Sequence, residues 1–440
     1  MMNWKSLLSS QRSGQTNPSQ EQSRSTFEQD YDRIIFSHPF RRLQDKTQVH
    51  PLPEHDFVHT RLTHSLEVSS VGRSLGKTVG EVVLQRSPAL ASSFSSFDFG
   101  AVVAAGALAH DLGNPPFGHS GEEAISDFFK HHPLGKHIES QVTDHQWNDL
   151  VQFEGNAQGF RLLTRNQYGL KLTYATLGAF TKYPCTSYFS NRDKKKRSQK
   201  KFGFFDSEYV HFKEVANALS LSEVNEWCWN RHPLAFLVEA ADDICYSIID
   251  LEDGCRLGLL SFEEALELLS GILGDKLNRE KLTQITGLNE QLGVLRAMVI
   301  RILTEDCATV FLDNETKILA GEFDIALTDA GKFCQELKTI GEVSINKIYR
   351  ARNVMEIEAA GFEALPGLLE EFIRASLHLK FRDQPRKFAT VARLIPPEIA
   401  IPVQSSNDTY TLCRLVIDFV SGLTDRHALS LFRKVKGISS

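Results

Sequence analysis

Apolar residues recur along the chain at helical spacing, separated by short polar stretches or by stretches that contain proline and glycine. From Phe99 to Ala109 the sequence has no charged or hydrogen-bonding side chain, so a helix over these residues must be buried on every side. The segment is too short to span a hydrocarbon layer of about 30 Å. Asp98 and Gly113 are suitable start and stop signals. The pattern therefore predicts a central core helix.

Two polar residues follow this apolar segment directly. His110 and Asp111 fall in its last predicted turn. Burying an imidazole and a carboxylate there is costly unless each has a strong partner, and a metal ion is such a partner. The sequence from 113 to 116, Gly-Asn-Pro-Pro, cannot continue a helix because proline lacks the N–H and restricts the residue before it. The chain is therefore expected to turn sharply just after the acidic residue.

A new helix is predicted after this turn. Ser120 and Glu123 have the spacing of a capping box, and apolar residues at helical spacing follow. His119 and Glu122 would then lie at the start of the helix, close to His110 and Asp111. Two satisfied core polar residues beside a helix cap would produce the same pattern, so this segment alone does not decide between structure and function.

Two other predicted helices carry candidate ligands. An amphipathic helix is predicted from Thr60 onward, with His64 near its start. A single histidine is more often a packed core residue than a ligand, unless a metal cluster elsewhere needs a second nitrogen. A strongly apolar helix is predicted from Pro233 to Asp253, with Gly254 as its stop signal. On this helix three polar residues four positions apart share one face: Asp242, Tyr246 and Asp250.

Helical patterns also account for most of the remaining chain. Helices are predicted at 153–165, 172–184, 348–362 and 418–437, with a capping box at Ser261 and Glu264 and a stop at Gly321. Few strand-like alternations and no βαβ pattern are present. The sequence therefore predicts an all-α fold.

Composition limits the environment and the partners. The chain has 440 residues and a formal net charge of −6, so any binding of phosphates must come from local basic clusters. Its seven cysteines are widely spaced with no CxxC pair, which argues against a disulfide framework or a thiolate zinc site. No 18-residue apolar run and no apolar signal core appear. We expect a soluble, cytoplasmic protein without a membrane partner.

One dense basic run falls in the segment 185–205. Seven lysines and arginines crowd between Arg192 and Lys201. Charge runs are usually solvated loops, but near an anionic ligand this one could close as a mobile lid, or it could contact nucleic acid. The three alternatives stay open at this point.

Long motifs in a fixed order add a family resemblance. The blocks are RLTHSLEVSSVGRSLG, HDLGNPPFGHSGE, FEGNAQGFRLL, TKYP and EAADDICYSIIDLEDG. The order His64, His110-Asp111 and Asp242 resembles the HD phosphohydrolase superfamily. The whole set is similar to its deoxynucleoside triphosphate triphosphohydrolases, of the deoxyguanosine triphosphate (dGTP) type. The similarity runs from one end of the chain to the other, and it implies an HD-domain helical core with additional N- and C-terminal helices.

The resemblance also implies roles for single residues. It places a divalent metal, Mn²⁺ or Mg²⁺, on His64, His110, Asp111 and Asp242, a donor set that suits such hard-to-borderline ions. It makes His119 and Glu122 catalytic. The implied substrate contacts are Gln48, Tyr246 and Asp250 at the deoxyribose, Lys182, Tyr183 and Lys201 at the phosphates, and Glu358 at the base.

The implied reaction is hydrolysis of a deoxynucleoside triphosphate to deoxynucleoside and inorganic triphosphate. We expect a short helix and a mobile arm at 1–26, the HD core at 27–260, and at 261–440 a helical region that contributes to the nucleotide site and to a homo-oligomer, a hexamer by resemblance. Single-stranded DNA or a nucleotide could act as effector. The alternatives are an HD-type nucleotidase or phosphodiesterase, and a nucleotide-sensing regulator that binds single-stranded DNA.

Overall fold

The structure, a computed structural model, describes residues 1–14, 24–48, 59–165, 168–189, 191–193, 195–382 and 385–438. The helices of the first half are α1 Trp4–Leu7, α2 Thr26–Ile35, α3 His38–Arg42, α4 Arg61–Arg86, α5 Pro88–Ala91, α6 Ser96–Ala109, α7 Gly118–His131, α8 Pro133–Glu139, α9 Asp144–Val151, α10 Gly155–Thr164, α11 Tyr174–Phe180, α12 Tyr209–Leu219 and α13 Pro233–Arg256. The helices of the second half are α14 Phe262–Leu273, α15 Arg279–Thr283, α16 Leu288–Asp313, α17 Glu315–Ala320, α18 Leu327–Ala330, α19 Cys334–Ser344, α20 Arg352–Phe381, α21 Lys387–Ala392, α22 Pro397–Ser405, α23 Thr409–Ser421 and α24 Asp425–Lys436.

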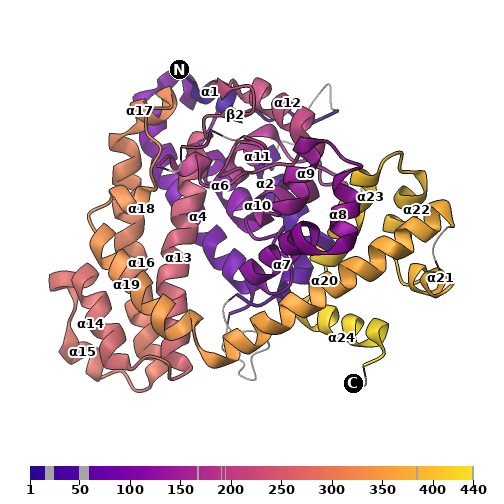
Figure 1. The fold of residues 1–440 in the computed structure, drawn as a ribbon. Helices are drawn as coiled ribbons and strands as arrows, with labels where there is room; N and C mark the ends of the chain where they lie inside the picture. Colours follow the sequence, from indigo (N-terminus) through magenta and orange to yellow (C-terminus); the bar gives the residue numbers. More distant parts are fainter. Residues whose placement is uncertain are drawn as a thin grey trace.

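Only one small sheet is present among the described residues. Strands β1, Glu223–Asn225, and β2, Cys228–Trp229, pair antiparallel in a short hairpin. All the other secondary-structure elements assigned in the described residues are helices, as Figure 1 shows. The predicted all-α fold is confirmed.

The predicted core helix lies at the centre of the N-terminal core. In α6, every residue from Val102 to Ala109 is buried, and the helix packs against α2, α4, α11 and α13. Two glycines of α4 allow the close approach. A Cβ atom added at Gly76 would lie 2.7 Å from Phe99 O, and one added at Gly80 would lie 2.8 Å from Phe99 Cβ. The tight crossing of α4 and α6 brings the start of α4 near the end of α6.

A second apolar cluster joins the middle of the chain to its C-terminal helices. Buried residues of α7 such as Phe129 pack in one cluster with residues of α20 and α23 such as Phe372 and Val416. Helix α20 is long and passes beneath α7 in Figure 1, linking the side of α14 and α19 to α21–α24. The region 261–440 therefore divides between the two clusters, because α14, α16 and α19 pack with the N-terminal core.

Several predicted helix limits are wrong. Gly254 does not stop α13, which continues to Arg256. Gly254 instead lies close to another element, because an added Cβ would lie 2.4 Å from Ile348 Cδ1 and would displace that side chain. The single helix predicted at 418–437 is interrupted between Ser421 and Asp425.

Two other predicted helices have different limits in the structure. The helix predicted at 172–184 is α11, and it ends at Phe180, so Lys182 and Tyr183 lie in the loop after it. The helix predicted at 348–362 begins at Arg352, after a π-helical turn Ile345–Tyr349. The predicted capping box at Ser261 and the stop at Gly321 are confirmed.

The N-terminal segment is partly fixed. Its initial helix is α1, as expected. Arg12, which falls within the expected mobile arm, is buried and pairs with the Asp30 carboxylate. The remainder of that arm, residues 15–23, lies outside the described residues.

Two features expected from the composition concern the cysteines and the length of apolar helices. All seven cysteines are free thiols, so the predicted absence of a disulfide framework is confirmed. In the part of the chain that the structure describes, no helix combines the length and the apolar character needed to cross a bilayer.

Candidate active site and metal centre

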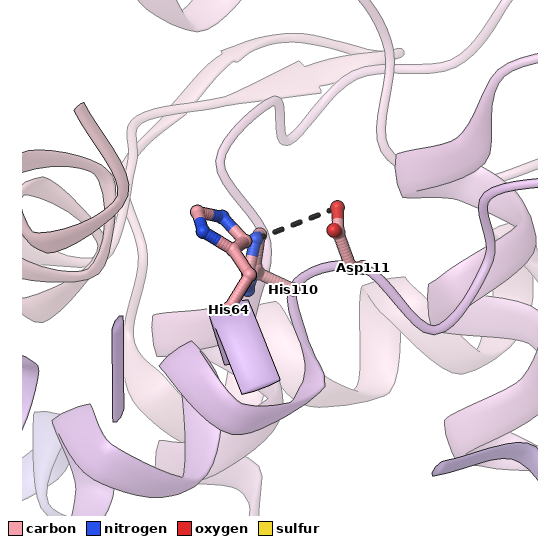
Figure 2. Close-up of side chains that lie close together, drawn as sticks. All are labelled: His64, His110 and Asp111. Atoms are coloured by element: carbon pink, nitrogen blue, oxygen red, sulfur yellow. Dashed lines mark ion pairs between the residues drawn. The ribbon is translucent and has the colours of Figure 1, made fainter. Parts of the chain in front are cut away.

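Side chains from three helices converge at one end of α6. His64 lies in the first turn of α4, His110 follows the last residue of α6, and Asp111 comes next. One ligand atom from each of the three lies within 4.8 Å of the others, and Figure 2 shows the three side chains gathered at one point. Asp242 of α13 completes the group, because its Oδ1 atom lies 3.3 Å from Nε2 of both His64 and His110. The structure thus brings all four predicted ligands together.

The ring of His110 is oriented to offer its Nε2 atom. Its Nδ1 lies 2.7 Å from the carbonyl oxygen of Ala107, which can only accept a hydrogen bond. Nδ1 therefore carries the proton and Nε2 keeps its lone pair, the usual arrangement of a metal-binding histidine. Nε2 lies 3.4 Å from Asp111 Oδ1. Two imidazole nitrogens and two carboxylates fit a divalent cation with positions left for oxygen ligands.

The carboxylate of Asp242 has two different neighbours. Oδ1 faces the two histidines, whereas Oδ2 is 2.5 Å from Lys182 Nζ. Burial opposes ionisation of Asp242, but the charge of Lys182 and the contact with His110 outweigh it and hold the pKa of that carboxyl well below its usual range. Asp242 is therefore an anion at neutral pH.

Asp111 is held as an anion in the same way. Burial opposes its charge, but the cationic Arg61 beside it lowers the pKa of the carboxyl below its usual range. Arg61 Nη1 donates to Asp111 Oδ2 over 2.8 Å. Oδ1 of Asp111 is left to face His110 and the centre.

The turn after Asp111 is fixed by close backbone packing. A Cβ added at Gly113 would lie 2.0 Å from Gly155 O, so the turn lies directly against the start of α10. Phe117 then has φ 65° and ψ 18°, a left-handed conformation that costs a non-glycine residue roughly 1–2 kcal/mol. Surrounding contacts must hold it.

Helix α7 begins at Gly118, two residues before the predicted cap. The predicted capping box of Ser120 and Glu123 is wrong, because Phe117 is the N-cap residue and no side chain caps the helix from this position. The left-handed Phe117 already directs the chain into the helix, so Ser120 lies within its first turn.

His119 and Glu122 form a dyad on this first turn. His119 Nδ1 lies 2.7 Å from Glu122 Oε2, and the N–H of Gly155 donates to Glu122 Oε1 over 2.6 Å. Burial opposes ionisation of Glu122, but the bond with His119 and the charge of Lys201 lower the pKa of the carboxyl. The carboxylate is fixed and charged, and it orients an imidazole whose other nitrogen is free to face the cavity.

A cavity of about 530 Å³ opens beside the predicted metal ligands. The sequence-predicted residues that line it are Gln48, His110, Asp111, His119, Glu122, Lys182, Tyr183, Lys201, Asp242, Tyr246 and Glu358. His64 and Asp250 are buried and are not among the residues that line it. Gln48 and Glu358, which are far apart in the sequence, both line this cavity.

Asp250 is held by a residue that the sequence did not indicate. Tyr349, in the π-helical turn before α20, donates its hydroxyl to Asp250 Oδ2 over 2.7 Å. The ring of Tyr349 also stacks on Tyr246, with 5.6 Å between the centroids. Burial raises the pKa of Asp250 to about 8, so this carboxyl is largely protonated at neutral pH.

The basic run is better anchored than expected. Ser198 and Gln199 are buried, and Arg197 Nε donates to Glu239 Oε1 over 2.9 Å. Arg197, Lys200 and Lys201 line the cavity, and Lys201 Nζ lies 3.1 Å from Glu154 Oε1. Lys194 lies outside the described residues.

Sequence reasoning missed some lining residues. The clearest is Arg61, which lies three residues before His64 on the same helix. That spacing places both on one helix face, and it could have identified Arg61. The other missed lining residues with functional polar groups are Thr47, Asn114, Glu154, Asp243 and Tyr349.

Comparison with known proteins places this site in a family. An HD domain matches residues 61–152, and a phosphohydrolase-associated domain matches residues 329–434. The first match contains three of the four clustered ligands, whereas Asp242 lies outside both matches.

Full-length relatives extend the comparison. The chain is 42% identical to a deoxyguanosinetriphosphate triphosphohydrolase-like protein of Synechocystis and 39% identical to one of Pseudomonas aeruginosa, with 100% of each chain covered in both alignments. It is 31% identical to a deoxyguanosinetriphosphate triphosphohydrolase of an Enterobacter species, with 97% of each chain covered. The chain therefore belongs to the family of deoxyguanosinetriphosphate triphosphohydrolases and their like, enzymes built on an HD domain.

Proposed function

We propose that the chain hydrolyses deoxynucleoside triphosphates, with dGTP as the expected substrate, to deoxynucleoside and inorganic triphosphate. The observation that carries this proposal is the convergence beside one cavity of four predicted metal-ligand side chains, a His119–Glu122 dyad and several cations. The relatives named for dGTP hydrolysis support the choice of substrate.

In the proposed site, His64, His110, Asp111 and Asp242 hold a Mn²⁺ or Mg²⁺ ion. When bound, such an ion neutralises charge that develops on the α-phosphate and lowers the pKa of a water molecule. These four side chains supply two anionic charges, so a divalent ion would leave the ligand set close to neutral. Arg61 keeps Asp111 ionised and oriented.

The dyad has a different proposed role. Glu122 fixes Nδ1 of His119, so the Nε2 atom of that ring faces the cavity and can take up or deliver a proton during attack of water at the α-phosphorus. Lys182, Tyr183 and Lys201 are proposed to bind the phosphates, and the charges of the two lysines favour departure of the triphosphate. Lys182 would exchange part of its contact with Asp242 for a phosphate oxygen.

The nucleoside is proposed to occupy the other end of the cavity. Gln48 would bind the 3′-hydroxyl, Tyr246 would stack on the sugar, and Asp250 would lie beside it. Contact with Tyr246 leaves little space for a 2′-hydroxyl, which would favour deoxyribose. Glu358 is proposed to read the base.

A product analysis tests this proposal. Each of the four deoxynucleoside triphosphates is incubated with the protein and Mg²⁺ or Mn²⁺, and the products are separated by chromatography. Deoxynucleoside and intact triphosphate are expected, with dGTP hydrolysed fastest. Release of phosphate or of a nucleoside monophosphate would instead favour an HD-type nucleotidase or phosphodiesterase. Nucleotide binding without hydrolysis would favour a regulator.

A further inference from the structure

One carboxylate from the C-terminal region anchors two walls of the cavity. Asp425 is the first residue of α24 and is only 1% exposed. Its Oδ2 accepts hydrogen bonds from Thr47 N over 3.1 Å and from Thr47 Oγ1 over 2.6 Å. Its Oδ1 accepts a hydrogen bond from Phe117 N over 3.1 Å. Both Thr47 and Phe117 line the cavity.

Each anchored residue is next to a residue of the proposed reaction. Thr47 precedes Gln48, and Phe117 lies two residues before His119. Phe117 is also the left-handed N-cap residue of α7, so its N–H must be held for the helix to start in this direction. The two oxygens of Asp425 therefore connect the segment that carries Gln48 to the segment that carries His119.

A buried lysine ties the same segment down from the other side. Lys46 Nζ donates to Asn114 O over 2.5 Å and to Ser421 O over 2.8 Å, and Arg61 N donates to Lys46 O over 3.0 Å. One short stretch is thus bonded to the turn after Asp111, to the start of α4 and to the break between α23 and α24. The C-terminal helices are part of the frame of the reaction centre.

We propose that Asp425 is a positioning residue that sets the place of His119 and Gln48 relative to the bound nucleotide. This inference rests on the proposed function. Catalysis is sensitive to such placement, since a displacement of about 1 Å can reduce a rate by on the order of 10²-fold. Asp425 acts through the main chain and hydroxyl of Thr47 and the main chain of Phe117, and it touches none of the four proposed metal ligands through a described hydrogen bond.

The first test removes the carboxylate. Asp425→Ala is expected to lower kcat/KM by about 10- to 100-fold with bound metal unchanged. Asp425→Asn keeps one acceptor oxygen and is expected to lie between the wild type and Asp425→Ala. Thr47→Val removes only the hydroxyl bond, so it is expected to raise KM and to leave kcat close to the wild-type value.

The second test separates positioning from a general loss of structure. If Asp425 acts on turnover through His119, then Asp425→Ala should lower kcat much less in a His119→Ala background than in the wild type, because the group that it positions is absent. A merely structural loss would lower kcat by the same factor in both. The matched control is Asp408→Ala. Asp408 is the exposed N-cap residue of α23, and its carboxylate accepts a hydrogen bond from Thr411 N. The kcat and KM of this variant are expected to be unchanged.

The proposal is overturned if Asp425→Ala has wild-type kcat and KM, or if it loses bound metal. It is also overturned if Asp425→Ala lowers kcat by the same factor in the wild-type and His119→Ala backgrounds. Should Asp425→Ala fail to fold, Asp425→Asn and Thr47→Val still decide it, and wild-type kinetics in both would overturn it. The wild-type protein in the same assay tests the proposed function separately. Absence of triphosphate release by the wild type overturns that function, whereas normal wild-type release with unchanged variants overturns only the role of Asp425.

Discussion

The Nδ1 atom of His119 lies 2.7 Å from Oε2 of Glu122, and the two side chains differ sharply in exposure. The side chain of His119 is 83% exposed, whereas that of Glu122 is 10% exposed. A buried carboxylate thus holds an imidazole that projects into the cavity. This geometry suits a proton carrier, because the fixed partner orients the ring while solvent and substrate can reach its other nitrogen.

His119→Ala is expected to separate proton transfer from metal binding. Bound metal and nucleotide affinity should stay near the wild-type values, and kcat should fall by about 10²- to 10⁴-fold, the usual contribution of general acid–base catalysis. Metal analysis of the purified variant, nucleotide titration and steady-state kinetics measure the three quantities. Loss of metal in this variant would show that His119 is a ligand.

Asp242→Ala is expected to behave in the opposite way. Its Oδ1 atom faces both ligand histidines, so the change removes a charged ligand and leaves Lys182 without its buried partner. Both bound metal and turnover should be lost. Asp243→Asn is the matched control for metal content, since Asp243 is the next residue but bonds Thr328. Retention of metal and activity by Asp242→Ala would refute the assignment of the centre.

The local parts of this site could be predicted from the sequence, and the long-range parts could not. His110, Asp111, His119 and Glu122 lie within one short motif, so their grouping needs only helix spacing and a proline turn. Asp425 contacts Thr47 across most of the chain, and no periodicity marks such a contact.

Two errors in helix limits have the same physical origin. Gly254 looked like a stop signal, but it lies inside the helix in close contact with the Ile348 side chain. Ser120 and Glu123 have the spacing of a cap, but the left-handed Phe117 starts the helix earlier. In both places tertiary packing outweighs the local signal.

Lysines within the basic run are expected to differ in effect. Lys201 lines the cavity and approaches Glu154, so Lys201→Met should raise KM for the nucleotide several-fold while the bound metal is unchanged. Lys195 is exposed and does not line the cavity, so Lys195→Ser should leave KM unchanged. Equal KM values for the two single variants would contradict the distinction.

Self-association through the C-terminal helices stays a prediction. Three large apolar side chains near the end of α20 and in the region that follows are strongly exposed: Phe381 at 57%, Leu394 at 50% and Ile401 at 64%. Exposed apolar side chains of this size are the kind that an interface between copies of the chain would bury. Light scattering at micromolar concentration is expected to show an oligomer, a hexamer by resemblance, and Phe381→Ser to reduce its mass. A monomeric wild type would refute the prediction.

Stability is expected to depend on pH through His232, at the start of the helix that carries Asp242. This imidazole is buried, its Nε2 lies 3.0 Å from Leu7 O, and its Nδ1 accepts a hydrogen bond from Leu234 N over 3.1 Å. Both contacts require the neutral ring with its proton on Nε2. Burial lowers the pKa of His232 to about 4, against about 6.5 in an unfolded chain. Between these values the unfolded chain binds more protons, so stability falls as pH decreases through the window.

A comparison of His232→Asn with the wild type isolates this effect. Asparagine is a good N-cap and can accept the hydrogen bond from Leu234 N without titrating. In the wild type, protonation of His232 in the unfolded chain lowers the free energy of unfolding at pH 5 by about 2 kcal/mol relative to neutral pH. Urea unfolding at pH 7.5 and pH 5 is expected to show that the stability advantage of the wild type over the variant shrinks by about that amount at the lower pH. Other titrating groups are common to both proteins and cancel in the difference. The same advantage at both pH values would mean that His232 is not held neutral in the folded protein.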